Sequence, residues 1–429
     1  MSKEPQSWLI LSHCYNMDGR AASQLITSRI PIFKRMGISC SVISAPNGEH
    51  DPETDTHHRV FSPFPSGLRF ELRHYIRRKI TIPLLRNALL FSVSFFLLPF
   101  YLLEKLFIRL ESQWSWFLTV YLRALLLFRG NEKFKMIYST GGPFSSHIAA
   151  ILLSKTYKLP CICEIQDPLV FDSPTWKPRG RSTYFYKKIE NFICKNADAI
   201  IFLTHTARNR ALARTKTNPN NFHSIYSGAL ASSQTVDLPA NNPSFELEMA
   251  HFGSLAGTRN LEALFAALLL VFEKNPHFKK KIKLSLYGNS DESVITSIEQ
   301  FPFKEIVSVE GFVSHDLATK RMQEVDLLLL IQDESCIARE TIPSKAYEYL
   351  HSGKPIFALV HNEELLQMLK SFNCYAAEII KPESIDDCLL QLQMDYEHGG
   401  LAKPSGGSPS TSDSVRSILR IAETLGSRN

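Results

Sequence analysis

Hydrophobic positions near the start of the chain follow two alternating periods. A continuous apolar run at residues 8–11 is typical of a buried strand, and residues 38–44 repeat that character. Between them, apolar side chains recur at helical spacing until Gly37, namely at Leu25, Ile26, Ile30, Phe33 and Met36. This strand, helix, strand order predicts the first unit of a parallel, doubly wound sheet.

The same alternation resumes after residue 135 and again after residue 245. Strands are expected at residues 136–139, 161–165 and 199–203, and then at 247–252, 282–287, 306–309, 326–331 and 355–360. Helices are expected from residues 145, 184 and 260 and over residues 345–351. The pattern therefore predicts an α/β protein with two doubly wound, Rossmann-like domains that face one another across a cleft.

Composition shifts mark the expected domain boundaries. Residues 1–231 form the first domain and residues 245–398 the second, because the polar, proline-containing stretch 232–244 has no period. A Gly/Ser/Pro-rich stretch at 399–414 reads as a flexible linker before a terminal amphipathic helix at 415–429.

Residues 67–128 interrupt the first domain with a different pattern. Six basic residues lie within residues 69–86, and residues 87–103 then carry no charge, with Pro99 among them. Aromatic residues mixed with arginines follow, as is typical where rings lie at lipid headgroup level. We expect a membrane-associating helical insertion that lies in or dips into one leaflet. A pair of buried core helices is the alternative, and a full span is disfavoured because it would separate the two halves of the sheet.

Overall composition narrows the class of protein further. Of the 429 residues, 44% are hydrophobic and 21% are charged, which excludes extensive disorder. The eight cysteines form no CxxC pair, so no zinc site is expected and most should be small core residues. The apolar run near the N-terminus is too short for a signal peptide, which favours a cytoplasmic location.

Two segments of the second domain carry candidate chemistry. Residues 251–260 (HFGSLAGTRN) leave a strand through Gly253 and Ser254 and deliver Arg259 near a helix start, which suits a diphosphate. Residues 339–355 place Glu340 in a loop and Glu348 inside a short helix, with Gly353 as the helix stop. Ser344 is expected to cap that helix. Taken alone, each of these residues also has an ordinary structural explanation.

This second segment resembles the family 4 retaining glycosyltransferases of GT-B fold. Their hallmark is two glutamates separated by seven residues before a Gly-Lys-Pro strand entry, which Glu340, Glu348 and residues 353–355 match. The resemblance implies that Glu348 holds the ribose hydroxyls, that Glu340 contacts the donor sugar, and that Ser344 and Lys345 lie against the phosphates. It further implies that the loop with Phe312 and Val313 reads the base. Ser254 stands where the family usually has a basic residue.

In the first domain the resemblance is looser. Gly19 occupies the place of one glycine of the family's Gly-Gly loop, while Asp18 departs from that pattern. Gln166 stands where many relatives have a histidine, so only Asp167 is carried over as a catalytic candidate near the reacting sugar. Asp167 followed by Pro168 also fits a plain strand end. Ser145 is expected only to cap a helix.

The cysteine content and the insertion predict a cytoplasmic protein at the inner face of the plasma membrane. The resemblance implies that this protein is a glycosyltransferase. It would move a sugar from a nucleotide-sugar donor to a glycan acceptor with retention, and it would need no cofactor and no metal. Because of the insertion we also expect a lipid-linked acceptor and binding to an anionic membrane surface. The apolar and aromatic residues of the insertion argue against nucleic acid as a binding partner. The alternatives are a nucleotide-sugar epimerase or hydrolase, an inactive sugar-sensing relative, or a basic protein that binds membranes or nucleic acid without catalysis.

Overall fold

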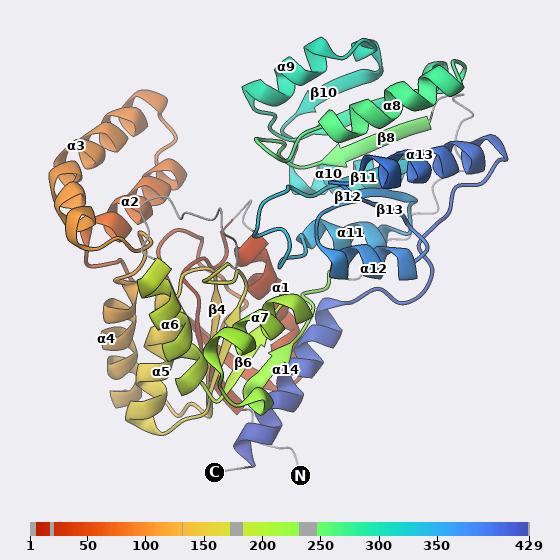
Figure 1. Cartoon of the computed structure of the whole chain (residues 1–429). Coiled ribbons are helices and arrows are strands. Elements are labelled where there is room, and N and C mark those ends of the chain that lie inside the picture. Colours follow the sequence, from red (N-terminus) through yellow and green to blue (C-terminus); the bar gives the residue numbers. More distant parts are fainter. Residues whose placement is uncertain (1–5, 18–20, 131, 172–182, 231–246, 428–429) are drawn as a thin grey trace. The chain divides into compact units, whose positions relative to one another are not determined.

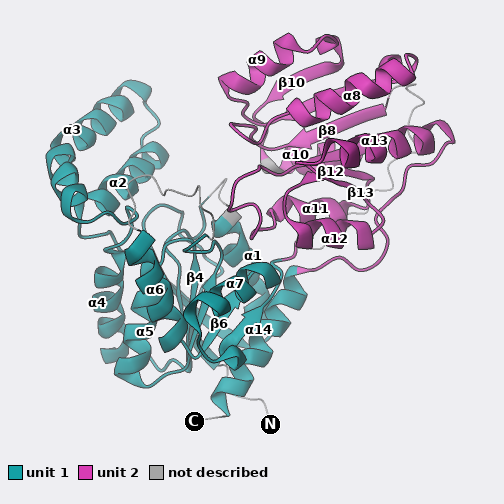
Figure 2. Ribbon diagram, viewed as in Figure 1, with its two compact units in different colours: residues 1–227, 411–429 teal, residues 228–410 magenta. Residues whose placement is uncertain are grey.

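The chain forms two compact units, residues 1–227 with 411–429 and residues 228–410 (Figure 2). The computed structural model describes residues 6–17, 21–130, 132–171, 183–230 and 247–427, and all structural statements concern these residues.

Unit 1 contains a parallel sheet of seven strands in the order β3-β2-β1-β4-β5-β6-β7. The strands are β1 (Gln6–Leu11), β2 (Ile38–Ser44), β3 (Thr56–Arg59), β4 (Met136–Gly141), β5 (Cys161–Ile165), β6 (Ala199–Phe202) and β7 (Phe222–Ser224). The helices are α1 (Ala21–Arg35), α2 (Pro65–Lys79), α3 (Pro83–Phe107), α4 (Trp116–Arg129), α5 (Ser145–Tyr157), α6 (Thr183–Asn196), α7 (His205–Thr215) and α14 (Thr411–Gly426) (Figure 1).

Unit 2 contains a parallel sheet of six strands in the order β10-β9-β8-β11-β12-β13. The strands are β8 (Leu247–Phe252), β9 (Ile282–Tyr287), β10 (Val307–Gly311), β11 (Leu327–Ile331), β12 (Ile356–Val360) and β13 (Tyr375–Glu378). The helices are α8 (Glu262–Lys274), α9 (Glu292–Gln300), α10 (His315–Glu324), α11 (Ser344–Ser352), α12 (Glu363–Ser371) and α13 (Pro382–Glu397).

The strand orders confirm the expected fold class of two doubly wound Rossmann-like units. Central strands such as β1 and β11 have almost fully buried apolar runs because helices cover both faces of a parallel sheet. The strand order reverses between β1 and β4 in unit 1 and between β8 and β11 in unit 2. Ligands of such sheets bind beyond the carboxyl ends of the strands at these reversals. The predicted cleft between the domains stays a prediction.

The chain returns to unit 1 at its C-terminal end. Helix α14 packs against α1, and its Val415 and Ile418 are fully buried with Ile26 and Ile30 in one core cluster. The helix begins at Thr411, four positions earlier than expected, so the last part of the predicted 399–414 linker is helical. The predicted linker 232–244 lies outside the described residues.

Helices α2 and α3 form a hairpin that carries most of the 67–128 insertion (Figure 1). Each starts with a proline at its first position, which is compatible with a helix start because that residue needs no N–H partner. Within the described residues, α3 is the one helix long and apolar enough to cross a membrane. Only 6% of its most apolar 18-residue stretch is buried. The alternative of two buried core helices is therefore wrong for α3. It holds for one face of α4, where Trp116, Val120 and Ala124 are buried.

Candidate functional site

Three glycines line the carboxyl ends of neighbouring strands in unit 2. Gly253, Gly288 and Gly311 follow or end β8, β9 and β10 with φ values of 144°, 135° and 75°. The N–H of Gly253 donates to Tyr287 O (2.6 Å), and the N–H of Gly288 donates to Gly311 O (2.7 Å). A Cβ on Gly288 would overlap the backbone of Gly253. The strand ends thus form a close-packed backbone surface of the kind that a diphosphate can approach.

Lys345 brings a cation to this surface from the first turn of α11. Its Nζ donates to Phe252 O and occupies the space where a side chain at residue 253 would begin. Burial lowers the pKa of the Lys345 ammonium to about 8; the Glu348 carboxylate opposes this shift, and the Arg259 charge adds to it. A bound diphosphate would raise the pKa of Lys345 again and so favour the charged form that burial disfavours.

His251 is a residue of this site that the sequence reasoning missed. The ring is fully enclosed, and its Nδ1 lies 3.0 Å from Leu329 O, so Nδ1 carries the proton and donates. Its Nε2 has no partner among the described residues and lies 3.5 Å from the position of a Cβ on Gly253. Burial first, and then the charge of Lys345, lower the pKa of His251 to about 3, so the ring is neutral.

Arg259 lies in the β8–α8 loop and faces the end of β11. Its Nη2 lies 3.0 Å from Asp333 Oδ2 in a half-exposed ion pair. Burial raises the pKa of Asp333, but hydrogen bonds from Ser335 and the Arg259 charge outweigh it and leave that pKa lowered. The guanidinium is thus oriented before any ligand binds, and its open side can receive a second anion.

Glu340 lies in the loop between β11 and α11, with only 1% of its surface exposed. Two buried amides that the sequence reasoning missed fix this loop. Gln332 Nε2 donates to Ala338 O (2.8 Å) and to Thr341 O (2.9 Å), and Asn362 Nδ2 also donates to Thr341 O (3.2 Å). A polar residue directly after an apolar strand is the sequence signal that could have identified Gln332.

The other predicted donor residues occupy separate places around the strand ends. Glu348 lies half-buried in α11, and Ser254 is exposed in the loop after Gly253. Phe312 is 79% exposed and Val313 half-buried after β10, at the far end of the glycine row. Those last two belong to the expected base-reading loop, and the structure gives no contact that joins them to Lys345 among the described residues.

The helix around Lys345 differs from expectation at its start and agrees at its end. The cap position is Pro343, whereas Ser344 is the first helical residue and its side chain makes no capping hydrogen bond, so the predicted cap at Ser344 is wrong. The cap predicted at Ser145 is wrong for the same reason, since Phe144 holds the cap position of α5. Gly353 ends α11 in the left-handed conformation, which confirms it as the helix stop.

The candidates of the first domain lie in unit 1. Asp167 follows β5, and surrounding protein atoms raise the pKa of its carboxyl by desolvation, although its outer edge is exposed. A ligand can reach this exposed edge. Gly19 lies outside the described residues. Asp167 belongs to unit 1 and the other catalytic candidate, Glu340, belongs to unit 2.

A buried polar network lies behind Asp167. Gln166 Nε2 donates to Thr140 Oγ1 (2.9 Å), whose hydroxyl donates to Glu164 Oε2 (2.6 Å). Glu164 in turn pairs with Arg29 Nη1 (2.5 Å), and Arg29 Nη2 donates to Ser414 of α14 (2.7 Å). Gln166 is therefore linked through Thr140 and Glu164 to a fully buried ion pair that also holds the C-terminal helix.

In the part of the chain that the structure describes, no cluster of three or more His, Cys, Asp or Glu side chains is arranged to hold a metal ion. The charges around Gly253 are instead those of Lys345 and Arg259.

No protein-family model and no curated protein sequence matches the chain. Solved structures do match its fold. The Anabaena HepE protein Alr3699, solved in complex with UDP, is 11% identical over 99% of both chains with a TM-score of 0.58. The sucrose-phosphate synthase of Thermosynechococcus elongatus is 13% identical over 98% of both chains, with a TM-score of 0.61. A putative UDP-N-acetylglucosamine 2-epimerase from Listeria monocytogenes is 10% identical over 99% of this chain and 97% of the other, with a TM-score of 0.52. The chain thus has the GT-B fold, which transferases and epimerases share.

Proposed function

We propose that the protein is a retaining glycosyltransferase that transfers a sugar from a nucleotide-diphosphate sugar to a lipid-linked glycan. The observation that carries this proposal is the meeting of Gly253, Lys345 and the neighbouring Arg259 at the carboxyl edge of the unit 2 sheet. A close backbone surface with two cations suits a diphosphate leaving group. The known fold neighbours include a protein solved with UDP and with UDP-glucose, which supports the same class of donor.

The proposed roles follow the charges that develop during transfer. Lys345 and Arg259 neutralise the departing diphosphate, so the reaction needs no metal ion. Glu348 binds the ribose, and Glu340, fixed by Gln332, positions the donor sugar. Asp167 of unit 1 is proposed to contribute from the acceptor side. Retention is proposed from the family resemblance alone.

Donor binding is tested first by thermal stabilisation with a panel of nucleotide sugars, because a ligand of the folded state raises its unfolding midpoint. The sugar that stabilises the protein is then offered with polyprenyl-diphosphate glycans, and the product's anomeric configuration is determined by NMR. We expect transfer with retention, and Glu340→Ala should abolish transfer. Glu363→Ala, which changes an exposed glutamate in the first turn of α12, is the matched control.

The epimerase or hydrolase alternative makes a different product from the same donor. An epimerised donor or free sugar, formed equally fast with and without acceptor, would overturn the transferase assignment. Unchanged transfer in Glu340→Ala would overturn the role of the glutamate pair.

We further propose that the α2–α3 hairpin binds the anionic inner face of the plasma membrane and thereby reaches a lipid-linked acceptor. Phe91, Phe95 and Phe96 of α3 are 71%, 61% and 69% exposed, so their rings are available for insertion. The preceding helix α2 carries several arginines. Two of the last three residues of α2, Arg77 and Lys79, are exposed. Cations beside an apolar helix are what an anionic leaflet attracts.

Vesicle sedimentation tests this attachment. Replacing the three phenylalanines with serine should release the protein from phosphatidylglycerol vesicles. The matched variant replaces exposed Leu269 and Leu270 of α8 in unit 2 and should stay bound. Equal sedimentation of the wild type and the triple variant would refute the membrane role. Salt-sensitive retention on DNA without vesicle binding would favour the non-enzymatic nucleic-acid alternative.

A further inference from the structure

A buried imidazole–carboxylate pair lies at the end of β1, outside the proposed donor site. His13 Nε2 is 3.0 Å from Glu71 Oε1, and neither side chain is exposed to solvent. Glu71 comes from α2 and also accepts hydrogen bonds from the backbone N–H and the hydroxyl of Ser62 (2.6 and 2.5 Å). The carboxylate is therefore fixed by Ser62 and orients the His13 ring.

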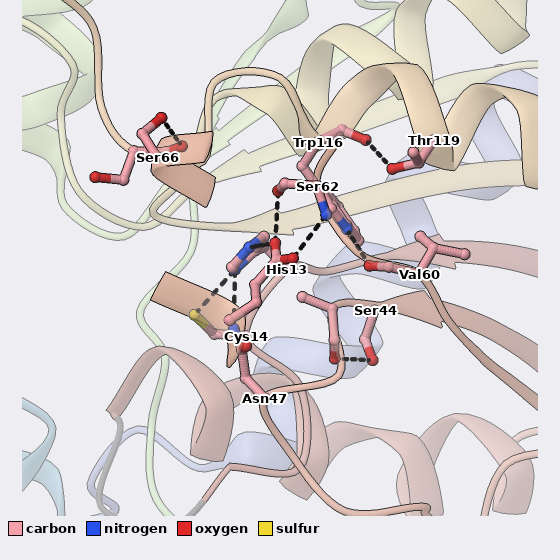
Figure 3. A network of polar contacts seen from close by, with 12 residues as sticks. His13, Cys14, Ser44, Asn47, Val60, Ser62, Ser66, Trp116 and Thr119 are labelled. Atoms are coloured by element: carbon pink, nitrogen blue, oxygen red, sulfur yellow. Dashed lines mark hydrogen bonds and ion pairs between the residues drawn. The ribbon is translucent and has the colours of Figure 1, made fainter. Parts of the chain in front are cut away.

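The other ring nitrogen of His13 faces a thiol. Cys14 Sγ lies 3.6 Å from His13 Nδ1, within hydrogen-bonding distance for sulfur (Figure 3). The amide of Asn47 stands 3.5 Å from the same nitrogen, and either end of that amide can face it. Cys14 as a residue is half-buried, unlike the fully buried Cys161 and Cys163. The thiol of Cys14 thus contacts the imidazole of His13, which contacts the carboxylate of Glu71. This is the arrangement of a cysteine nucleophile with its base and an orienting acid.

The electrostatics of the cluster favour a charged imidazole. Burial lowers the pKa of His13, but hydrogen bonds with Cys14 and Glu71 outweigh it and raise that pKa to about 9. Cys14 and Glu71 are the titratable groups that face the ring, while Phe70 of α2 and Trp116 of α4 contribute only uncharged rings. A ring nitrogen beside a sulfur atom, with the ring held by a carboxylate, is the arrangement that activates a cysteine nucleophile.

We propose that Cys14 is a reactive thiol, activated by His13 and Glu71, and that it is a modification site for hydroperoxides and similar small electrophiles. The thiolate sulfur attacks one peroxide oxygen, the O–O bond breaks and an S–O bond forms. The sulfur is oxidised by two electrons to a sulfenic acid, and the hydroperoxide is reduced to an alcohol, whose oxygen takes up a proton from solvent. This proposal does not depend on the glycosyltransferase assignment.

The remaining cysteines provide internal controls. Cys161, Cys163 and Cys194 lie buried in the core of unit 1, so they become reactive only if that unit unfolds. Cys336 and Cys388 of unit 2 are half-buried like Cys14 and report the reactivity of a thiol of similar exposure. Burial raises the pKa of the Cys388 thiol to about 12, which makes it the slow reference.

The test measures alkylation of each cysteine in the full chain by iodoacetamide at pH 7, followed by mass spectrometry of the peptides. We expect Cys14 to react on the order of tenfold faster than Cys336, because the His13 ring lies within hydrogen-bonding distance of its sulfur. His13→Gln should bring Cys14 to the rate of Cys336, and Glu71→Gln should slow it as well. Treatment with hydrogen peroxide and dimedone should label Cys14 before any other cysteine.

Two results would overturn the proposal. One is a wild-type Cys14 that reacts no faster than Cys336; this comparison needs no variant and stands even if a variant fails to fold. The other is an unchanged Cys14 rate in His13→Gln while Cys161, Cys163 and Cys194 stay protected, because the imidazole would then have no role in activation.

Discussion

The buried ammonium of Lys345 predicts that donor binding depends on pH. Only the charged form neutralises a diphosphate, and burial lowers the pKa of Lys345 to about 8 in the free protein. A bound diphosphate should raise that pKa again, so binding takes up a proton. Donor affinity is therefore highest below pH 8 and falls as pH rises through that value. Lys345→Met removes the charge, keeps an unbranched side chain and should abolish this dependence.

The structure sets the size of the effect. With a pKa of about 8, roughly nine tenths of the lysine is charged at pH 7 and roughly one tenth at pH 9. If the charged form alone pairs with the diphosphate, affinity falls about tenfold between these pH values, or ~1.4 kcal/mol. His251 does not add to the slope, because its pKa of about 3 keeps it neutral throughout. The wild type at pH 9 should approach the affinity of Lys345→Met.

Isothermal titration calorimetry measures this directly. The nucleotide sugar that stabilises the protein is titrated at pH 7 and pH 9, in buffers with different ionisation enthalpies that reveal proton uptake. Lys370→Met, which changes an exposed lysine at the end of α12, should behave like the wild type. Equal wild-type affinity at both pH values, or a tenfold loss that persists in Lys345→Met, would refute the reasoning.

Further predictions concern the backbone surface, the buried ion pair and the hairpin. Gly253→Ala should eliminate donor stabilisation in the thermal assay, because a Cβ there collides with Lys345 Nζ, whereas Gly407→Ala, with open space around it, should have no effect. Arg29→Met should lower the free energy of unfolding by about 3–5 kcal/mol in urea denaturation, because it leaves the Glu164 carboxylate buried without its partner; a loss below ~1 kcal/mol would contradict this. The α3 triple variant should keep the wild-type unfolding midpoint, and a large drop would mean that its rings stabilise the fold.

Most of the fold could be predicted because buried parallel strands have continuous apolar runs. Strands β1, β11 and β12 contain such runs, and each lies within two residues of the expected bounds. Strand β3 (Thr56–Arg59) was missed because its sequence, THHR, is polar. It lies at the edge of the unit 1 sheet, where only one neighbour pairs with it and the side chains stay partly exposed. Hydrophobic periodicity therefore carries little information about an edge strand.

The candidate site, too, could be predicted from the sequence only where a local motif marks its residues. Gly253 and Lys345 were found from local motifs, but their direct contact joins residues far apart in the sequence. His251 was missed because the orientation of its ring depends on the carbonyl group of Leu329, 78 positions later in the chain. Leu329 lies on β11, which pairs with β8 in the sheet although other strands separate them in the sequence. Gln332 and Asn362 act through carbonyl groups of a loop, and main-chain acceptors leave no trace in the sequence. Supporting residues of this kind depend on tertiary structure that periodicity does not predict.

Buried carboxylates help to hold the base of the α2–α3 hairpin, together with Trp114 and Trp116, which pack into the core of unit 1. Glu104 at the end of α3 accepts hydrogen bonds from the Ser66 N–H (2.8 Å) and from Trp114 Nε1 (2.6 Å). Glu111 accepts from the Phe144 N–H at the start of α5 (2.9 Å). Because these contacts lie at the base of the hairpin and Phe91, Phe95 and Phe96 are exposed, the three rings are not required for attachment and stay available for a lipid surface. Loss of vesicle binding without loss of stability is therefore the outcome that this construction predicts for the triple variant.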